Sequence, residues 1–375
     1  MKVLITGANG FVGKNLQLHM VERKDVEVVC YTREHSVTQL PELLQGVDFV
    51  FHLAGVNRPH EPDEFSVGNT DLTMALCEAV AGLTVTQGRK VSVLFASSAQ
   101  AECDNPYGTS KRRAEDALFA LQRQHGVPVH VFRLPNVFGK WCKPNYNSAV
   151  ATFCHNVARD LPIKVNDPTS PLTLVYIDDV LQHFIQLMDG TTATVDANGF
   201  SVLVPQYTTT VGEVANIVHA FRGSRLTLLT ERVGTGLVRA LYATYVSYLP
   251  PEAFTYTVPM HSDPRGVFAE MLKTPDCGQF SYFTAHPGVT RGGHYHHSKT
   301  EKFLVIKGQA RFRFHHMHTG ETYELVTSVE KAEIVETVPG WSHDITNIGT
   351  EEMIVMLWAN EVFDRQYPDT FASPF

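Results

Sequence analysis

Short apolar runs alternate with amphipathic stretches over the first 180 residues of the chain. The runs are rich in β-branched and aromatic residues, and they occupy residues 3–5, 26–30, 49–53, 91–95 and 129–132. Each run is short enough to form a buried strand. Helix-like stretches lie between them, at residues 14–22, 73–81 and 110–124. Such alternation predicts βαβ units and therefore an α/β domain with a parallel sheet.

The pattern changes near residue 250. Residues 237–249 have the character of an apolar helix, which Pro250-Pro251 should stop. From Tyr256 onward the apolar runs are short and are broken repeatedly by glycine and proline, as in a small all-β sandwich or barrel. We therefore expect two domains, residues 1–250 and 251–375, and a length of 375 residues agrees with that number.

Composition and charge narrow the functional classes. Apolar residues make up 43% of the chain and charged residues 19%, a balance typical of globular proteins. The net charge of -8, without any basic run, argues against a nucleic acid or an anionic membrane as partner. Six scattered cysteines without a C-x-x-C pair indicate reduced thiols. Because the first residues already form a predicted strand and no apolar run approaches the ~20 residues of a membrane span, we expect a cytoplasmic protein.

A glycine-rich turn follows the first predicted strand and opens the first helix. It reads Thr6-Gly7-Ala8-Asn9-Gly10-Phe11-Val12-Gly13, with glycines in a G-x-x-G-x-x-G spacing. The first glycine permits a tight turn, the second lets the backbone approach a pyrophosphate, and the third lets helix and strand pack closely. The pattern predicts a dinucleotide site formed by Gly7, Asn9, Gly10, Phe11, Val12 and Gly13.

The end of the second predicted strand indicates which dinucleotide is bound. NAD sites usually place an acid there for the ribose 2′-hydroxyl, whereas this chain has Thr32-Arg33. An arginine suits the 2′-phosphate of NADP, although Glu34 is close enough to keep NAD open. We expect NADPH, bound in part by Thr32 and Arg33.

Further motifs follow in an order that resembles the extended short-chain dehydrogenase/reductase superfamily over about residues 1–245. They are DFVFHLAG at 48–55, Asn69, FASSA at 95–99, Tyr107-x-x-x-Lys111, RLPNVFG at 133–139 and LVYIDDV at 174–180. The resemblance implies a Rossmann fold. It also implies cofactor contacts from Leu53, Ala54, Gly55, Asn69, Tyr107, Lys111 and Leu134, with Asn136 on the substrate side.

Residue types at the predicted catalytic positions suit carbonyl reduction. Tyr107 and Lys111 lie one turn apart on one helix face, and a nearby ammonium group should lower the pKa of the phenol. Tyr107 could then donate a proton to a carbonyl oxygen as hydride arrives from the nicotinamide. Ser98, in preference to Ser97, would hydrogen-bond that oxygen. Only residues 99–106 separate Ser98 from Tyr107, fewer than in the superfamily, so the position of the serine stays open.

The C-terminal part resembles the cupins. GVTRGGHYHHSKTEKFLVIKG, residues 288–308, matches the pattern G-x5-H-x-H-x4-E-x6-G, and PGWSHDITN, residues 339–347, resembles the second cupin motif. The resemblance implies an all-β cupin, an RmlC-like jelly roll, with His294, His296, Glu301 and His343 as metal ligands. Such a ligand set suits Zn, Fe, Mn or Ni, and we expect one divalent metal, zinc in the first place. A metal-free barrel is the alternative.

Two other C-terminal segments contain candidate functional residues. DPRGVFAE, residues 263–270, resembles the opening of the dTDP-4-keto-6-deoxy-sugar 3,5-epimerases, in which the arginine contacts the nucleotide-sugar phosphate. This favours Arg265 as a substrate residue, with a strand-end salt bridge as the alternative. The cluster of His315, His316 and His318 precedes Thr319-Gly320, so we expect a solvated hairpin tip there.

The combination of reductase and cupin, with YNSAV at 146–150 and WANEVFDRQYPDTF at 358–371, resembles the CapF family of bifunctional enzymes in capsular polysaccharide synthesis. The resemblance implies a homodimer acting on UDP-2-acetamido-2,6-dideoxy-hexos-4-ulose. Tyr146, Asn147 and Ser148 would contact this substrate. The cupin would epimerise C3, and NADPH-dependent reduction at C4 would give UDP-N-acetyl-L-talosamine, the precursor of UDP-N-acetyl-L-fucosamine.

Three other functions remain open at this point. The cupin could be a structural or regulatory barrel beside a simple reductase. The chain could be an NAD-retaining epimerase or dehydratase, or a sensor without turnover. The base that would remove the C3 proton is also open, with His297, Tyr295 and Lys302 as unranked candidates.

Overall fold

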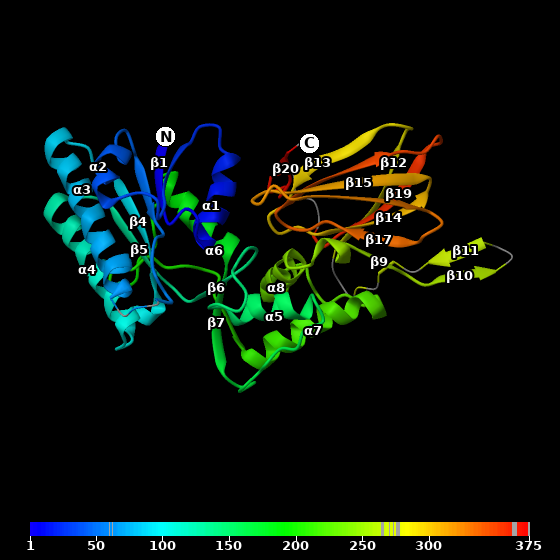
Figure 1. The fold of residues 1–375 in the computed structure, drawn as a ribbon, viewed down its shortest axis with the longest axis horizontal. Helices are drawn as coiled ribbons and strands as arrows, with labels where there is room; N and C mark the ends of the chain where they lie inside the picture. The colour runs from blue at the N-terminus through cyan, green and yellow to red at the C-terminus, as the bar shows by residue number, and fades with distance from the viewer. Residues whose placement is uncertain are drawn as a thin grey trace. The chain divides into compact units, whose positions relative to one another are not determined.

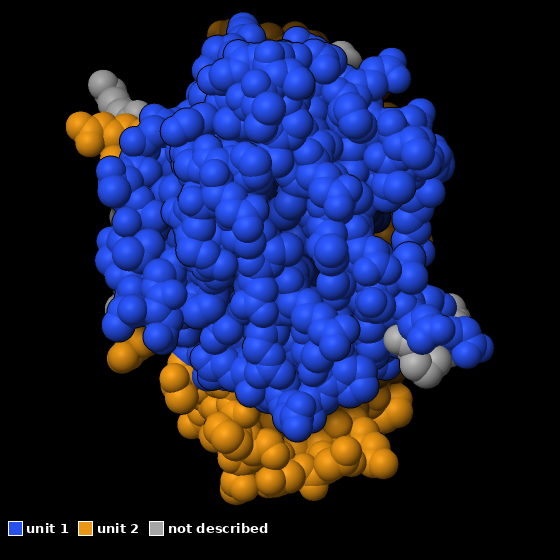
Figure 2. Space-filling view, turned by 90° about the vertical axis from the view of Figure 1, so that its left-hand side faces the viewer, with its two compact units in different colours: residues 1–137, 173–207 blue, residues 138–172, 208–375 orange. Residues whose placement is uncertain are grey.

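A computed structural model describes residues 1–59, 61, 63–263, 266–269, 271–272, 274, 278–361 and 366–373. The chain forms two compact units, residues 1–137 with 173–207 and residues 138–172 with 208–375 (Figure 2). The boundary expected near Pro250 stays a prediction. The structure does end its last long helix at Ser247, before that point, and it begins the antiparallel strands at Thr255, after it.

The first unit is built on a parallel sheet of five strands. These are β1 (Lys2–Thr6), β2 (Glu27–Tyr31), β3 (Phe49–His52), β4 (Ser92–Ser98) and β5 (Val129–Leu134), paired in the order β2-β1-β3-β4-β5. Each of the four neighbouring pairs is parallel. This confirms the sheet predicted from the alternating pattern, and each strand lies within a few residues of its predicted run.

Helices cover both faces of this sheet (Figure 1). They are α1 (Phe11–Val21), η1 (Val37–Gln39), α2 (Leu40–Leu43), η2 (Ser66–Asp71), α3 (Leu72–Gln87), η3 (Ala99–Glu102), α4 (Pro106–His125) and α6 (Ile177–Met188). On the face of α6, the Phe184 ring lies 6.4 Å from the Phe51 ring and 5.1 Å from the Phe132 ring. The strands are therefore buried on both sides, which explains why they read as continuous apolar runs.

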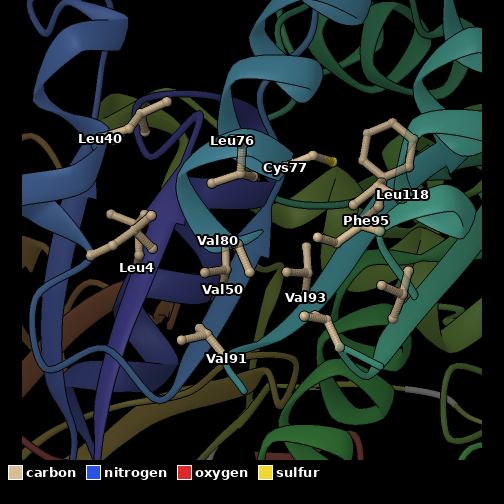
Figure 3. Packing of buried hydrophobic residues seen from close by; sticks show 14 of the residues in the cluster. Leu4, Leu40, Val50, Leu76, Cys77, Val80, Val91, Val93, Phe95 and Leu118 are labelled. Carbon is tan, nitrogen blue, oxygen red and sulfur yellow. The ribbon is translucent and has the colours of Figure 1, made fainter. Parts of the chain in front are cut away.

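The core beneath α3 and α4 is a layer of aliphatic side chains (Figure 3). Leu4, Val50 and Val93 come from three adjacent strands, and Leu76 and Val80 descend from α3. All five are fully buried. Side chains alternate along a strand, so these residues face α3 and α4 while their neighbours in the chain face α6.

Short strands and three further helices complete the fold outside the two regular regions. The strands are β6 (Asn136–Phe138), β7 (Pro171–Tyr176) and β8 (Tyr207–Thr210), which pair in the order β6-β7-β8. The helices, all in the second unit, are α5 (Ala149–Val157), α7 (Val211–Thr227) and α8 (Gly236–Ser247). The Phe221 ring of α7 packs 5.0 Å from the Tyr242 ring and 5.8 Å from the Tyr245 ring of α8.

The rest of the second unit is antiparallel β-structure, with two five-stranded layers and a separate pair formed by β10 and β11 (Figure 1). One sheet has the order β12-β19-β14-β17-β9 and the other β16-β15-β18-β13-β20. After η4 (Pro251–Ala253), the strands are β9 (Thr255–Thr257), β10 (Met260–Asp263), β11 (Gly266–Ala269), β12 (Gln279–Ala285), β13 (Thr290–Tyr295), β14 (Glu301–Lys307), β15 (Gln309–His316), β16 (Thr322–Ser328), β17 (Glu333–Glu336), β18 (Trp341–Asn347), β19 (Met353–Ala359) and β20 (Phe371–Ala372). This confirms the all-β region, while its assignment to the cupins stays a prediction.

The cysteines and the helices that the structure describes bear on two general properties of the chain. Cys30, Cys77, Cys103, Cys142 and Cys154 are free thiols, as expected, and Cys277 lies outside the described residues. Among the helices that the structure describes, none combines the length and the apolar character needed to cross a membrane.

A buried cluster of charges joins α7 to the antiparallel sheet within the second unit. The Glu336 carboxylate of β17 accepts hydrogen bonds from Lys302 of β14 and from Arg225 of α7. Lys302 also donates to the Tyr256 hydroxyl at 3.1 Å. Burial alone would raise the pKa of Glu336, but the two cations hold it below its usual value. The cluster is thus held together by the one carboxylate that both cations share.

We predict that Glu336→Gln destabilises the second unit. The substitution keeps the shape of the side chain but leaves two buried cations without their counter-charge, which should cost about 3–5 kcal/mol of unfolding free energy. Chemical denaturation followed by tryptophan fluorescence measures this unit specifically, because Trp141, Trp341 and Trp358 all belong to it.

The control for this variant is Glu351→Gln. Glu351 is 77% exposed and its carboxylate lies 3.6 Å from the Lys307 ammonium nitrogen, so its loss should change stability by no more than about 1 kcal/mol. Equal stability of the two variants would show that the buried cluster contributes nothing specific.

Candidate functional site

The glycine turn follows β1, the strand at which the order of strands in the parallel sheet changes direction. The chain passes from β1 to β2 on one side and returns to β3 on the other, and ligands of open α/β sheets bind at such a point, outside the carboxyl ends of the strands. Gly7 has a φ of 69°, and a Cβ there would lie 2.6 Å from the Ala54 nitrogen in the loop after β3. A Cβ on Gly13 would lie 2.4 Å from the Gly7 carbonyl oxygen. The two glycines therefore allow the close packing expected of a dinucleotide site.

The other predicted turn residues surround the start of α1. Gly10 is the N-cap of this helix, while Phe11 and Val12 form its half-buried first turn. Asn9 is exposed on the turn itself. The first amides of a helix have no partners within the helix and carry a partial positive charge, which suits phosphate groups.

A chain of hydrogen bonds beneath this loop was missed by the sequence analysis. The Ala54 amide donates to the Thr6 hydroxyl at 3.2 Å, and that hydroxyl lies 2.7 Å from Nδ1 of His52. Nε2 of His52 lies 2.8 Å from the Thr73 hydroxyl, which donates to the Asn69 carbonyl at 2.6 Å. Burial lowers the pKa of His52 to about 3, so the ring is neutral and can donate through Nε2.

Asn69 fixes the loop that would lie against the dinucleotide. Its Oδ1 accepts from the Val56 amide at 2.8 Å, and its Nδ2 donates to the Val56 carbonyl at 2.9 Å and to the Ser110 hydroxyl at 2.9 Å. A Cβ on Gly55 would lie 2.9 Å from Oδ1 of Asn69 and 3.1 Å from Nζ of Lys111. The structure thus brings the predicted loop residue Gly55 next to both Asn69 and Lys111, with Leu53 and Ala54 just before it.

The short segment between Ser98 and Tyr107 still brings the two residues together. η3 compacts this segment, and a Cβ on Gly108 would lie 2.3 Å from the Gln100 carbonyl oxygen, so only glycine permits the fit. Asn105 caps α4 by accepting from the Gly108 amide at 2.8 Å, which starts the helix at Pro106 and puts Tyr107 in its first turn. A hydrogen bond from Ser98 lowers the pKa of Tyr107 in part, which agrees with the expected role of Ser98.

The pKa of Tyr107 is raised in this structure, not lowered as expected. Burial raises the pKa of Tyr107 above its usual value, and the hydrogen bond with Ser98 opposes this only in part. Burial also lowers the pKa of Lys111 to about 8, with Glu115 acting in the opposite direction. The Lys111 ammonium donates to the Ala96 carbonyl at 3.1 Å. Burial, which spacing along a helix does not reveal, is thus the largest influence on the pKa of both groups.

Ser97 has a different partner from Ser98. Its hydroxyl donates to the buried Glu115 carboxylate at 2.5 Å, and Arg133 of β5 donates to the same carboxylate at 2.6 and 3.0 Å. Glu115 lies one turn after Lys111 on α4, which is the signal in the sequence that could have identified it. This network joins β4, α4 and β5 next to the predicted catalytic positions.

The residues expected at the ribose lie at the carboxyl end of β2. Arg33 is exposed and has no hydrogen bond or ion pair with another described residue. Thr32 is half-buried, and its amide donates to Nδ1 of His35 at 3.1 Å. The arginine therefore has its guanidinium available at the position where a 2′-phosphate would be bound.

The predicted substrate residues belong to different parts of the chain. Asn136 of β6 is exposed and donates to the Thr173 carbonyl at 3.1 Å, close in sequence to the buried Leu134. Ser148 caps α5 by accepting from the Ala151 amide at 3.2 Å, and Tyr146 and Asn147 precede it in the second unit. Arg265 lies outside the described residues.

The four predicted metal ligands converge inside the antiparallel unit. His294 belongs to β13 and His343 to the neighbouring strand β18, while Glu301 opens β14 in the other sheet. One ligand atom from each of His294, His296, Glu301 and His343 lies within 4.8 Å of those of the other three. Each ligand position predicted from the two motifs is therefore part of one cluster.

The chemistry of this cluster fits a cation. His296 Nδ1 contacts the Asp369 carbonyl at 2.5 Å, and because a carbonyl only accepts, Nδ1 carries the proton. Nε2 then faces a Glu301 carboxylate oxygen at 3.1 Å, and the Nε2 of His343 faces the same oxygen at 3.4 Å. Neither ring nitrogen of His343 makes a hydrogen bond to a described residue. Nitrogen and oxygen donors that face one another in this way fit around a shared metal ion.

Protonation of the ligands also agrees with metal binding. Burial, together with His343 and His296, lowers the pKa of His294 to about 3, and burial lowers the pKa of His343. Burial would raise the pKa of Glu301, but His296 and His343 hold it well below its usual value. Neutral imidazoles and an ionised carboxylate are the forms that bind a divalent cation.

The structure distinguishes among the base candidates. Lys302 is fully engaged by Glu336 and Tyr256, and although burial would lower its pKa, Glu336 raises it above the usual value, which disfavours this residue as a base. Tyr295 is buried and its ring lies 5.6 Å from that of His297. The second histidine cluster lies on the β15–β16 hairpin, as expected, but the expectation of a solvated tip holds only for His318. His316 is half-buried, and its ring lies 5.6 Å from the Trp141 ring.

Two family models match successive parts of the chain. Residues 3–202 match the NAD dependent epimerase/dehydratase family, and residues 261–371 match the polysaccharide biosynthesis C-terminal domain. The first covers the unit with the parallel sheet and the second covers most of the antiparallel strands.

Known proteins are similar to the whole of this chain or to part of it. A Pseudomonas aeruginosa protein named UDP-2-acetamido-2,6-beta-L-arabino-hexul-4-ose reductase is 64% identical over 99% of this chain and 98% of its own length. The crystal structure of the capsular polysaccharide assembling protein CapF from Staphylococcus aureus is 40% identical over the whole of both chains, with a TM-score of 0.67. UDP-glucuronic acid 4-epimerase from Bacillus cereus, at 18% identity over 60% of this chain and 84% of its own, with a TM-score of 0.51, shares the fold. The chain therefore belongs to the NAD dependent epimerase/dehydratase family and, over its full length, to the CapF family.

Proposed function

We propose that the chain is a bifunctional nucleotide-sugar enzyme that epimerises C3 of UDP-2-acetamido-2,6-dideoxy-hexos-4-ulose and then reduces its C4 ketone. The product would be UDP-N-acetyl-L-talosamine, the precursor of UDP-N-acetyl-L-fucosamine. NADPH would supply the hydride in the parallel-sheet unit. A cupin barrel with one divalent metal, zinc in the first place, would carry out the epimerisation. The resemblance to the CapF family also supports a homodimer.

The reductase assignment rests on one observation: Ser98, Tyr107 and Lys111 are grouped beside the loop of residues 53–55. Ser98 can hydrogen-bond the Tyr107 hydroxyl, and Lys111 lies against Gly55 in that loop. The name of the Pseudomonas aeruginosa relative, a UDP-sugar reductase, supports the same reaction and the same class of substrate.

Proton transfer in the reduction would run through Tyr107. The dinucleotide, when bound, supplies hydride to C4. Ser98 would hydrogen-bond the ketone oxygen and hold it beside the Tyr107 hydroxyl, which donates its proton to that oxygen. Burial raises the pKa of Tyr107, so the hydroxyl is protonated and ready to donate at neutral pH. The Lys111 ammonium would stabilise the phenolate that remains.

The chemistry of the substrate requires epimerisation to come first. The C3 proton is acidic because it is α to the C4 ketone, and reduction removes that ketone. A divalent metal held by His294, His296, Glu301 and His343 would supply a Lewis acid that polarises an oxygen of the sugar. The reductase unit contributes no group with an assigned role in inversion at C3, which is why we place that step in the barrel.

Replacing Tyr107 by phenylalanine should separate the two reactions. Loss of the proton donor should slow NADPH oxidation by about 10²–10⁴-fold, while deuterium from solvent should still enter C3. Both signals are measured on the UDP-4-keto sugar, by absorbance and by mass spectrometry. Tyr282→Phe is the matched control, since Tyr282 is 72% exposed and should keep both activities. If deuterium uptake is lost together with reduction in Tyr107→Phe, both steps share the parallel-sheet unit.

Arg33 should set the preference for NADPH over NADH. A charge-assisted hydrogen bond contributes ~1.5–3 kcal/mol, so Arg33→Ala should lower kcat/KM about ten- to a hundredfold with NADPH and leave NADH unchanged. Arg123→Ala, an exposed arginine in the last turn of α4, is the control. A wild-type enzyme that uses both cofactors equally, or that retains tightly bound NAD without consuming NADPH, contradicts the proposal.

The barrel should bind about one divalent metal per chain. His294→Ala removes one of four ligands and should reduce both the bound metal and the deuterium uptake at C3, while NADPH binding persists. Elemental analysis of the purified variants measures the metal. His318→Ala, an exposed histidine on the β15–β16 hairpin, should keep the full amount. Wild-type protein without metal, even after expression in zinc-rich medium, would favour the metal-free barrel.

A further inference from the structure

The segment between two of the metal ligands is held in an unusual way. Residues 297–301 connect His296 to Glu301, and each of their five amides donates to a side-chain oxygen instead of a backbone carbonyl. The Thr300 amide donates to Oδ1 of Asn360 at 2.8 Å, and the Glu301 amide to the Thr337 hydroxyl at 3.0 Å. Every residue of the segment is buried, so its amides depend on these acceptors.

One side chain, Asp369, accounts for three of the five amides. Its Oδ1 accepts from the His297 amide at 2.9 Å, and its Oδ2 accepts from the Ser298 amide at 2.9 Å and the Lys299 amide at 2.7 Å. The Ser298 hydroxyl donates to the same Oδ2 at 3.1 Å. An ionised carboxylate that accepts several amides is a strong anchor for a loop.

The backbone of Asp369 contacts a ligand directly. Its carbonyl accepts from Nδ1 of His296, which fixes the orientation of the ring and leaves Nε2 as the ligand atom. The two roles come from one residue: the carboxylate sets the path of the chain toward Glu301, and the carbonyl sets the tautomer of His296. Residues outside the connection between His296 and Glu301 therefore fix both of its ends.

Asp369 belongs to residues 368–373, which we call the C-terminal strap. The strap packs against the part of the chain that contains His294 and His296. β20 pairs with β13, with Ala372 opposite His294, and the Ser373 amide donates to the Gly293 carbonyl at 2.8 Å. The Lys299 ammonium donates to the Thr370 hydroxyl at 2.7 Å and to the Pro368 carbonyl at 3.3 Å. The strap thus contacts the chain from Gly293 to Lys299, while Asn360 and Thr337 hold the last two amides of the connection.

We propose that Asp369 is the positioning residue of the metal centre, holding the His296–Glu301 connection with its carboxylate and the His296 ring with its carbonyl. The inference rests on the proposed metal binding by the barrel. Binding of the metal and closure of the C-terminal strap are then thermodynamically linked, and each strengthens the other by the same factor. The metal centre consequently depends on a residue that contacts no metal itself.

Asp369→Asn tests this role in the full chain, stripped of metal and titrated with zinc against a chromophoric chelator. An asparagine of the same size turns an NH₂ group toward amide donors, and the zinc affinity should fall about 10- to 100-fold. In the cobalt-loaded protein the d–d absorption bands should shift, because the ligand geometry relaxes. Tyr367→Ala, two residues away and 78% exposed, should change neither quantity. NADPH binding, a property of the other unit, should persist in both variants.

Hydrogen exchange of the wild-type chain gives a second test that needs no variant. Zinc should slow the exchange of the amides at 297–301 and of those in the C-terminal strap. If Asp369→Asn has the zinc affinity and the cobalt spectrum of the wild type, the inference is overturned while the proposed metal centre stands. Absence of zinc-dependent protection in the strap would also overturn it, including in the case where Asp369→Asn fails to fold. A wild-type chain that binds no zinc would overturn both this inference and the proposed metal centre.

Discussion

The loops after β1 and β3 approach one another so closely that only glycine fits between them. At Gly7 a Cβ would lie 2.6 Å from the Ala54 nitrogen, and a φ of 69° disfavours other residues there as well. This contact brings the N-terminus of α1 to the edge of the sheet where a dinucleotide binds. It also allows the Thr6 hydroxyl to join the Ala54 amide to His52. The remaining features of the predicted cofactor site depend on these two loops staying in contact.

Both proposed sites are supported by buried polar residues that would touch neither substrate nor metal. In the parallel-sheet unit, Glu115 joins Ser97 to Arg133 and so fixes the end of β4 beside α4. In the antiparallel unit, Asp369 and Asn360 satisfy the amides between two metal ligands. Unsatisfied buried polar groups are costly, so each network favours one arrangement of its neighbourhood. The precision that the proposed hydride transfer and metal binding need would come from these supports as well as from the reacting groups.

Burial changes the acid–base properties of the two sites in opposite ways. In the reductase unit it raises the pKa of Tyr107, which keeps the phenol protonated as a donor. In the antiparallel unit it lowers the pKa of His294 and His343, which favours the neutral imidazoles. A buried site disfavours the charged form of each group, and the charged form is the anion of a phenol but the cation of an imidazole. The same physical effect therefore favours a protonated phenol in one unit and neutral imidazoles in the other, as the two proposed sites require.

The sequence by itself determined the features that depend on local periodicity or fixed spacing. Alternating apolar runs predicted the parallel sheet, the glycine turn predicted the site beside Gly7, and the H-x-H-x4-E pattern predicted ligands that the fold brings into one cluster. Only the tertiary structure showed that the Ser97 hydroxyl is bound to Glu115, while Ser98 influences the pKa of Tyr107. It also reversed the predicted shift in the pKa of Tyr107, since desolvation depends on the surrounding packing. Asp369 could not be found from spacing, because 72 residues separate it from His297 and only the folding of the barrel brings them together.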